Sequence, residues 1–343
     1  MDFAPNLNSS DGFSMARAAN VCDIDFSQDT VFLPVLYGIF FTVGLPLNLL
    51  AMYGLYRLIK SENVLPVYLI NLLLSDLLQL LTLPLWMDYY SSGHRWRYGP
   101  QACQVMALVF YVSIYASIFF MCAIALERHL AVARPFRFQA ARSLRNARWV
   151  ALSLWVAVAV PPSVALKVLF PVSEDSALCI EKYPSEQAFV TYRLVTLVLS
   201  FFLPLAFIAA LHRATLRALA GVGSLARGEK RRIRGLLTLL VVTFVLVLGP
   251  YHLVGSVKYV GLLFRPGDCE WEDAVYLPYQ GGRALLCLNS ILDPVFYIFL
   301  RGDFREAARR YVPCLKRAQW FASQERSSDL GERPTNSTQD PEM

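Results

Sequence analysis

Charged residues are scarce in this chain of 343 residues. Asp, Glu, Lys and Arg together make up 17% of the sequence, whereas an average soluble domain contains roughly 25%. Hydrophobic residues make up 56%, and a soluble protein of this size would have to expose large patches of that surface. The composition therefore excludes a soluble globular enzyme and indicates a membrane protein.

The sequence also lacks the patterns of common catalytic sites. It contains neither the His-Glu-x-x-His pattern of zinc peptidases nor the Gly-x-Ser-x-Gly pattern of serine hydrolases. The segment from Gly223 to Lys230 vaguely resembles a phosphate-binding loop, but Glu229 occupies the position of the essential lysine and no strand precedes it. We therefore predict that the protein is not an enzyme.

Apolar runs of membrane-spanning length recur along the chain. A helix of about 20 apolar residues crosses the roughly 30 Å hydrocarbon layer of a bilayer. Seven such runs are present, at about 31–56, 66–90, 101–132, 148–171, 188–217, 234–262 and 272–300. The predicted fold class is an all-α membrane protein, a seven-transmembrane helix bundle, whose termini lie on opposite sides of the membrane.

Basic residues gather in the first, third and fifth connections and after the last run, whereas the other connections are rich in acids. Because connections rich in Lys and Arg stay in the cytoplasm, we expect the N-terminus to be extracellular in the plasma membrane. The same rule accounts for the basic run at 227–234, so no nucleic acid partner is expected. Asn8 then begins a usable glycosylation sequon.

The expected organisation has four parts. Residues 1–30 form an extracellular segment and residues 31–300 form the bundle. Residues 301–318 form a short amphipathic helix 8 on the membrane lipids, with Cys314 as a palmitoylation site. Residues 319–343 are polar and are expected to be a disordered cytoplasmic tail.

Short motifs occur in these runs in a fixed order. They are Gly44 to Asn48, Asn71 to Asp76, Cys103, Glu127-Arg128-His129, Trp155, Pro204, Phe244 with Pro250, and Asn289 to Tyr297. With these motifs the chain resembles the rhodopsin-like (class A) G protein-coupled receptors over all seven runs. The resemblance implies a heterotrimeric G protein as partner, with arrestin and receptor kinases in addition.

Several positions depart from the usual pattern of that family. Glu127 and His129 replace the usual Asp and Tyr around Arg128, and Asp293 replaces the usual Asn before Pro294. Other stretches, among them Leu178 to Pro184, are similar to the proton-sensing and lysolipid-linked receptors within the class.

Four of the seven cysteines lie in predicted extracellular parts, where an oxidising environment permits disulfides. Spacing alone does not decide how they pair. The similarity to the lysolipid-linked group implies the pairs Cys103–Cys179 and Cys22–Cys269.

The resemblance also assigns switch residues at the cytoplasmic side. Arg128 pairs with Glu127 at rest and moves toward Tyr297 on activation. The G protein cavity is lined by Arg128, His129, His212 and Lys230. A lysine at 230 replaces the acid that clamps the arginine in many relatives, so we predict basal signalling. The packing switch of the family corresponds to Ile118, Pro204 and Phe244.

Two acids lie deep in the predicted bundle, where ionisable groups are costly and usually functional. Asp76 and Asp293, with Ser117 and Asn289, are expected to form a polar cluster, for which the resemblance implies a sodium ion at Asp76. The alternative is a purely structural hydrogen-bond network. No other cofactor is expected.

Cations from several helices are expected to converge in the outer half of the bundle. They are Arg283, Arg193 and Lys258, and the candidate residues beside them are Tyr111, Tyr115, His252 and Tyr279. Converging cations suit a carboxylate or phosphate, and apolar walls suit an acyl chain. The ligand hypothesis is therefore an anionic, lipid-like molecule.

Alternatives to this ligand remain. The cations could reach the membrane interface or pair with outer acids, which we favour for Lys167 and Lys258 but not for the deeper Arg283. Proton sensing is the rival hypothesis, resting on the Asp76–Asp293 pair, His252 or the outer acids. A transporter or channel is the alternative of another class, but the sequence has no internal repeat.

Overall fold

The computed structural model of the protein describes residues 22–56, 64–134, 143–169, 178–222 and 225–300, with the backbone alone for residues 169 and 295–300. The chain divides into two compact units, Met1–Phe296 and Tyr297–Met343, and the account below concerns the first. Predictions for Asn8, Cys314, the amphipathic helix and the tail lie outside the described residues.

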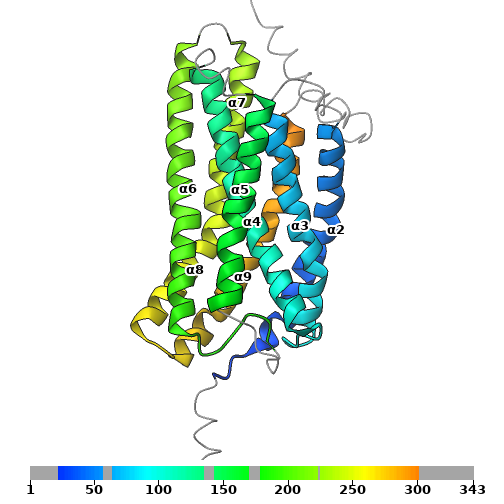
Figure 1. The fold of residues 1–343 in the computed structure, drawn as a ribbon, viewed down its shortest axis with the longest axis vertical. Coiled ribbons are helices and arrows are strands. Elements are labelled where there is room, and N and C mark those ends of the chain that lie inside the picture. Colours follow the sequence, from blue (N-terminus) through cyan, green and yellow to red (C-terminus); the bar gives the residue numbers. More distant parts are fainter. Residues whose placement is uncertain (1–21, 57–63, 135–142, 170–177, 223–224, 301–343) are drawn as a thin grey trace, which may run out of the picture. The chain divides into compact units, whose positions relative to one another are not determined.

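The described part of the chain is helical, without strands (Figure 1). In chain order the elements are η1 (Phe26–Gln28), α2 (Asp29–Tyr56), α3 (Leu65–Ser91), α4 (Gly99–Ala133), α5 (Leu144–Val164), η2 (Ala165–Leu169), α6 (Gln187–Gly221), α7 (Arg227–Thr243), η3 (Phe244–Leu248), α8 (Gly249–Phe264) and α9 (Cys269–Leu300). Because α7, η3 and α8 follow one another without a break, the described part of the chain has seven helical segments of membrane-spanning length. The predicted fold class is confirmed.

Six of these segments are long and apolar enough to cross a membrane. The seventh, α9, is more polar, since it has acids in its first turn and carries Arg283 and Asp293 further along. Helices cover all seven predicted runs within the described residues, but the sixth begins at Arg227 instead of residue 234. The difference arises because hydropathy detects only the apolar part of a helix, and the first turns of α7 are basic.

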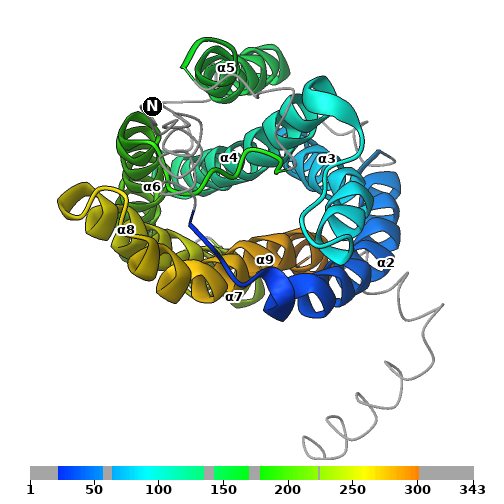
Figure 2. The same cartoon turned by 90° about the horizontal axis from the view of Figure 1, so that it is seen from below.

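Figure 2 shows α2, α3, α4, α6, α8 and α9 arranged in a ring, with α5 outside it. Helix α5 packs against α4 and α3. Large apolar side chains such as Val31, Val164 and Leu203 remain more than half exposed. Exposed apolar surface of this extent is what a lipid-facing helix requires.

The sixth segment is interrupted at its middle. The π-helical turn η3 ends at Leu248 and Pro250 follows in the first turn of α8. Proline removes a backbone donor, and π-helical turns are a common cause of helix kinks. Helix α9 approaches the first turn of α8 closely, since a Cβ on Gly282 would lie 2.9 Å from the Cα of Tyr251.

Both disulfides implied by the resemblance are present in the structure. Cys103 at the start of α4 is bonded to Cys179, and Cys22 is bonded to Cys269 at the start of α9. The second disulfide packs with Ile24 into a small apolar cluster. The two bonds therefore tie Cys22 and Cys179, with the described residues that follow them, to the starts of α9 and α4.

Candidate functional site

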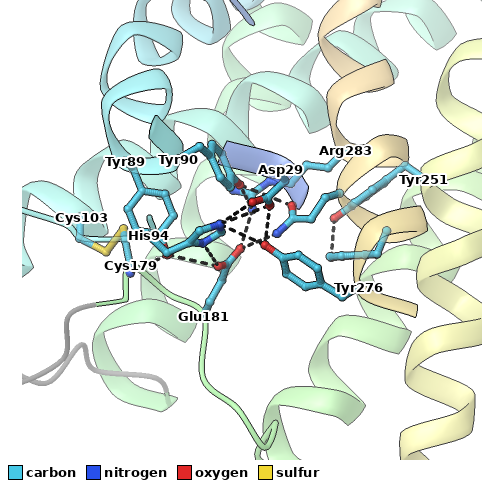
Figure 3. Close-up of polar contacts among 12 residues, drawn as sticks. Asp29, Tyr89, Tyr90, His94, Cys103, Cys179, Glu181, Tyr251, Tyr276 and Arg283 are labelled. Carbon is cyan, nitrogen blue, oxygen red and sulfur yellow. Dashed lines mark hydrogen bonds and ion pairs between the residues drawn. A yellow bond between two sulfur atoms is a disulfide. The ribbon is translucent and has the colours of Figure 1, made fainter. Parts of the chain in front are cut away.

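The carboxylate of Glu181 lies at the centre of a buried polar cluster in the outer half of the bundle (Figure 3). Its Oε1 accepts hydrogen bonds from Gln280 Nε2 at 3.0 Å and from Arg283 Nη1 at 3.2 Å. Its Oε2 lies 3.2 Å from both the Tyr89 hydroxyl and His94 Nδ1. One carboxylate from the segment before α6 thus joins the end of α3 to the middle of α9.

His94 connects this carboxylate to a second one. Its Nε2 lies 3.0 Å from Asp29 Oδ1 at the start of α2, and its ring stacks on Phe26 with centroids 4.2 Å apart. The Tyr276 hydroxyl donates to Asp29 Oδ2 at 2.5 Å. Asp29 and His94 are almost fully buried, so the histidine bridges two acids in a site sheltered from water.

The electrostatics of the cluster favour its charged form. Burial on its own lowers the pKa of His94, but hydrogen bonds and charges from Glu181 and Asp29 outweigh it and raise the pKa to about 9. Burial raises the pKa of Glu181, but the bond and charge of His94 and the charge of Arg283 lower it to about 2. Opposite charges within hydrogen-bond distance stabilise each other's ionised forms.

Arg283 is buried, as predicted, and already has an acidic partner. Besides Glu181, its Nη1 donates to the Tyr90 hydroxyl at 3.1 Å, and its guanidinium lies 4.9 Å from the Trp86 ring centroid. The sequence offered no sign of the partner, because Glu181 lies 102 residues away. We expected Arg283 to be free to bind the ligand, but in the structure it is already paired with Glu181.

Arg193 on α6 forms the centre of a second cluster. It is 3% exposed and donates to the hydroxyls of Tyr251 and Tyr279, the latter at 3.0 Å. Its guanidinium lies 4.6 Å from the ring centroid of Tyr111. No acid pairs with Arg193 within the described ranges.

Lys258 on α8 lies beside this cluster and is also 3% exposed. Its ammonium is 4.8 Å from the ring centroid of Tyr279 and 5.7 Å from that of Tyr259. The alternative favoured for Lys258, reaching the interface or pairing with an acid, is therefore not what the described residues show. Lys167, in contrast, is exposed.

The outer acids that were candidate partners for these cations form no ion pair with them within the described ranges, and Glu272 keeps one buried carboxylate oxygen without a hydrogen-bond partner. Glu181 contacts Arg283, whereas Glu272 accepts the backbone N–H of Ser185 at 2.7 Å. Asp273 accepts the backbone N–H of Asp25 at 3.3 Å. Arg193 and Lys258 thus remain two buried cations whose side-chain partners are tyrosines.

His252 lies apart from the outer acids. Its Nδ1 donates to the Leu248 carbonyl at 2.7 Å and its Nε2 lies 3.4 Å from the Ser200 hydroxyl. The ring stacks on Phe201. Tyr115, the remaining predicted pocket residue, lies on α4 one turn from Tyr111.

A third polar cluster lies deeper in the bundle. Asn289 Nδ2 donates to Ser117 Oγ and to Asp293 Oδ2, both at 2.8 Å. Asp76 is fully buried, and neither of its carboxylate oxygens has a hydrogen-bond partner within the described ranges. A buried acid with unused oxygens beside a hydroxyl and an amide oxygen fits the oxygen ligands that a hard cation prefers.

The predicted switch residues lie at the end of the bundle opposite the two disulfides. Arg128 Nη2 lies 3.8 Å from Glu127 Oε1, which is the expected resting ion pair. His129 Nδ1 lies 3.0 Å from the hydroxyl of Thr215, and Lys230 is partly exposed. His212 is partly buried, and the side chain of Tyr297 is outside the described part.

The predicted packing-switch residues are all buried. Ile118 and Phe244 are fully buried, on α4 and η3, and Pro204 is buried in α6. Phe244 stacks near Phe201 with centroids 6.3 Å apart.

The sequence prediction missed the residues of the Glu181 cluster other than Arg283. No motif in the sequence distinguishes His94 or Asp29 from the other polar residues of the connections. One available signal was the scarcity of histidine, since the chain contains four and His94 is the only one in an outer connection. The partners of His94 come from helix ends far apart in the sequence, which no local pattern reveals.

Comparison with known proteins gives consistent matches. The profile of the family described as 7 transmembrane receptor (rhodopsin family) matches residues 47–297. G-protein coupled receptor 68 from Homo sapiens is 32% identical over 86% of this chain and 80% of its own length. G-protein coupled receptor 65 from Homo sapiens is 33% identical over 79% of this chain and 83% of its own length. Probable G-protein coupled receptor 132 from Mus musculus is 29% identical over 85% and 77%, respectively.

Proposed function

The chain belongs to the rhodopsin family of seven-transmembrane receptors, and we propose that it transmits the binding of an extracellular anionic, lipid-like ligand to a heterotrimeric G protein. It is a multi-pass membrane receptor, and this membership argues against the transporter or channel alternative. The extracellular N-terminus is part of the proposal. It is supported by the Lys and Arg residues of the first, third and fifth connections, because such connections stay in the cytoplasm.

The observation that carries the ligand proposal is the pair of buried cations Arg193 and Lys258. Both are 3% exposed, and neither forms an ion pair with an acid within the described ranges. A buried charge without a counter-charge is expensive. An anionic head group between α6 and α8 removes that cost, which supports a carboxylate, sulfate or phosphate as the charged part of the ligand.

The walls around these cations supply the apolar part of the site. Tyr111 and Tyr279 present aromatic rings to the cations, and Phe189 packs against Tyr259. Ligand sites combine such apolar walls with few polar groups that fix orientation. An acyl or aromatic body attached to the anionic head group matches this composition.

At the cytoplasmic end, the ligand would favour a state in which Arg128 leaves Glu127 and a G protein helix enters. Asp76, Ser117, Asn289 and Asp293 would hold the sodium ion, whose positive charge would offset the buried carboxylates. Arrestin and receptor kinases are further partners of the proposal.

The test is a signalling assay with lysophospholipids and oxidised fatty acids at one fixed pH. We expect Arg193→Gln and Lys258→Gln each to weaken the response to an active lipid at least tenfold, because each removes a counter-charge of the head group. Lys167→Gln is the matched control, because Lys167 is an exposed cation in η2, the turn that continues α5. A lipid response equal in all four proteins would exclude this site.

Protons are the second candidate signal, because His94 bridges two buried acids. With the cluster formed, the pKa of His94 is about 9, against 6.5 for a free histidine. Protonation therefore favours the cluster fully below about pH 6.5, and this effect is lost as the pH rises through about 9. In lipid-free medium, a pH-dependent signal that persists unchanged in His94→Gln would count against this candidate.

A further inference from the structure

We propose that Glu181 is a tethered anion: the chain's own carboxylate fills an anion-binding site around Arg283 and keeps external carboxylates out of it. Figure 3 shows the side chain entering among groups from α3 and α9. The inference is independent of the lipid ligand and of G protein coupling, because it concerns which anion binds beside Arg283.

The groups around the Glu181 carboxylate form a complete site for such an anion. Arg283 and Gln280 donate to one oxygen, and Tyr89 and His94 contact the other, all between 3.0 and 3.2 Å. Two partners for each oxygen, two of them cationic, are what a bound free carboxylate would require. Since the pKa of Glu181 is about 2, the group is an anion at any physiological pH.

The segment that carries Glu181 is held in place by covalent and local features. Cys179, two residues earlier, is bonded to Cys103 on α4. Between them, Ile180 has a φ of 66°, a backbone conformation that β-branched residues rarely adopt. Such a conformation persists only where the surroundings determine it, so the path of the chain from the disulfide to Glu181 is constrained.

The site has more donor capacity than Glu181 uses. Arg283 Nε and the Trp86 indole Nε1 are both buried without an acceptor within the described ranges, and the guanidinium lies against the Trp86 ring. Removal of the Glu181 carboxylate would leave a buried cation and unused donors around a space of the size of acetate. A small carboxylate could then bind there, whereas in the native chain the tethered one competes at a far higher effective concentration.

The experiment is chemical rescue of the full-length receptor, purified in lipid nanodiscs and followed by thermal unfolding. Glu181→Ala should lower the unfolding temperature by about 5 °C or more, because it leaves Arg283 without its buried partner. Millimolar sodium acetate should recover most of that loss, and acetamide, its neutral analogue, should not. Neither compound should shift the unfolding temperature of the unmodified receptor by a comparable amount.

Two further variants define the site. Glu186→Ala removes an exposed acid from the same segment, whose ion pair in the described part of the chain is with exposed Lys182, and should change neither stability nor the acetate response. Glu181→Ala combined with Arg283→Met should abolish the acetate effect. An equal acetate effect in the unmodified receptor, or its persistence without Arg283, would overturn the proposal, as would a Glu181→Ala variant of unchanged stability.

If Glu181→Ala is too unstable to purify, surface labelling of cells that express it decides the question. Growth in acetate should then restore surface abundance relative to growth in acetamide, and equal abundance in both media would overturn the proposal.

Discussion

His94 is a residue whose protonation should affect the stability of the fold. Its imidazole lies between Glu181 and Asp29, and the ring is buried against Phe26. The sequence shows a histidine in an outer connection and gives no indication of this environment. Only the meeting of α2, α3 and the segment before α6 creates it.

This environment predicts a pH-dependent stability. The pKa of His94 is about 9 in the folded protein and 6.5 in the unfolded chain, so its contribution is complete below pH 6.5 and is lost as the pH rises through about 9. The shift corresponds to at most about 3 kcal/mol of unfolding free energy. Thermal unfolding of the purified receptor should show the unfolding temperature falling between these pH values.

His94→Gln is the informative variant for this slope. Glutamine keeps a hydrogen-bond donor but does not titrate, so the variant should be less stable at pH 6.5 and should approach the unmodified receptor at high pH. A slope that survives unchanged in His94→Gln would assign the pH dependence to other groups.

At the scale of the helices, the contact between α8 and α9 supports both outer clusters. Tyr251 and Lys258 come from α8, while Tyr279 and Arg283 come from α9. Hydropathy predicted both helices, because each is an apolar run of sufficient length. It could not predict their close approach, which depends on the absence of a side chain at Gly282.

Gly282→Ala is therefore expected to destabilise the receptor. The added Cβ would lie 2.9 Å from the Cα and 3.1 Å from the backbone nitrogen of Tyr251, and backbone cannot yield as a flexible side chain can. Overpacking of this kind costs about 1–3 kcal/mol, which thermal unfolding detects.

Gly281→Ala provides the matched control one residue earlier in the same helix. Nothing lies within 4 Å of a Cβ at Gly281, so the substitution should be neutral or slightly stabilising through helix propensity. Equal effects of the two substitutions would show that helix propensity, not the contact with Tyr251, determines the result.

At the scale of the whole receptor, we expect the balance between resting and signalling states to depend on Arg128 and its partners. The only resting partner predicted for Arg128 was Glu127, and that pair is present at 3.8 Å. Lys230 stands where many relatives have an acid, by the resemblance described above. We therefore expect measurable signalling without ligand.

Lys230→Glu should reduce this basal signalling. The new carboxylate offers Arg128 an additional acidic partner in the resting state, and an ion pair worth up to about 1 kcal/mol shifts the populations by up to about fivefold. Second-messenger levels at equal surface expression measure the effect. Arg231→Glu, with the same change in charge at an exposed neighbouring position, should have a smaller effect.

The sequence thus predicted the features that depend on local composition or on family motifs. These are the seven helical segments, the two disulfides and the Glu127–Arg128 pair. It did not predict the pairing of Glu181 with Arg283 or the burial of Lys258. Both depend on which ends of the helices meet, and side chains more than 100 residues apart leave no periodic signal.

Trp271 of α9 contacts the outer end of α8, and its indole fluorescence can report on this contact. Its indole occupies the space that a side chain at Gly261 would fill, and its Nε1 donates to the Lys258 carbonyl at 3.1 Å. Indole emission responds to hydrogen bonding and hydration, and the bonded carbonyl belongs to a residue of the proposed head-group site. A receptor that retains Trp271 as its single tryptophan would therefore report occupancy of that site by a change in the wavelength of indole emission, without any added label.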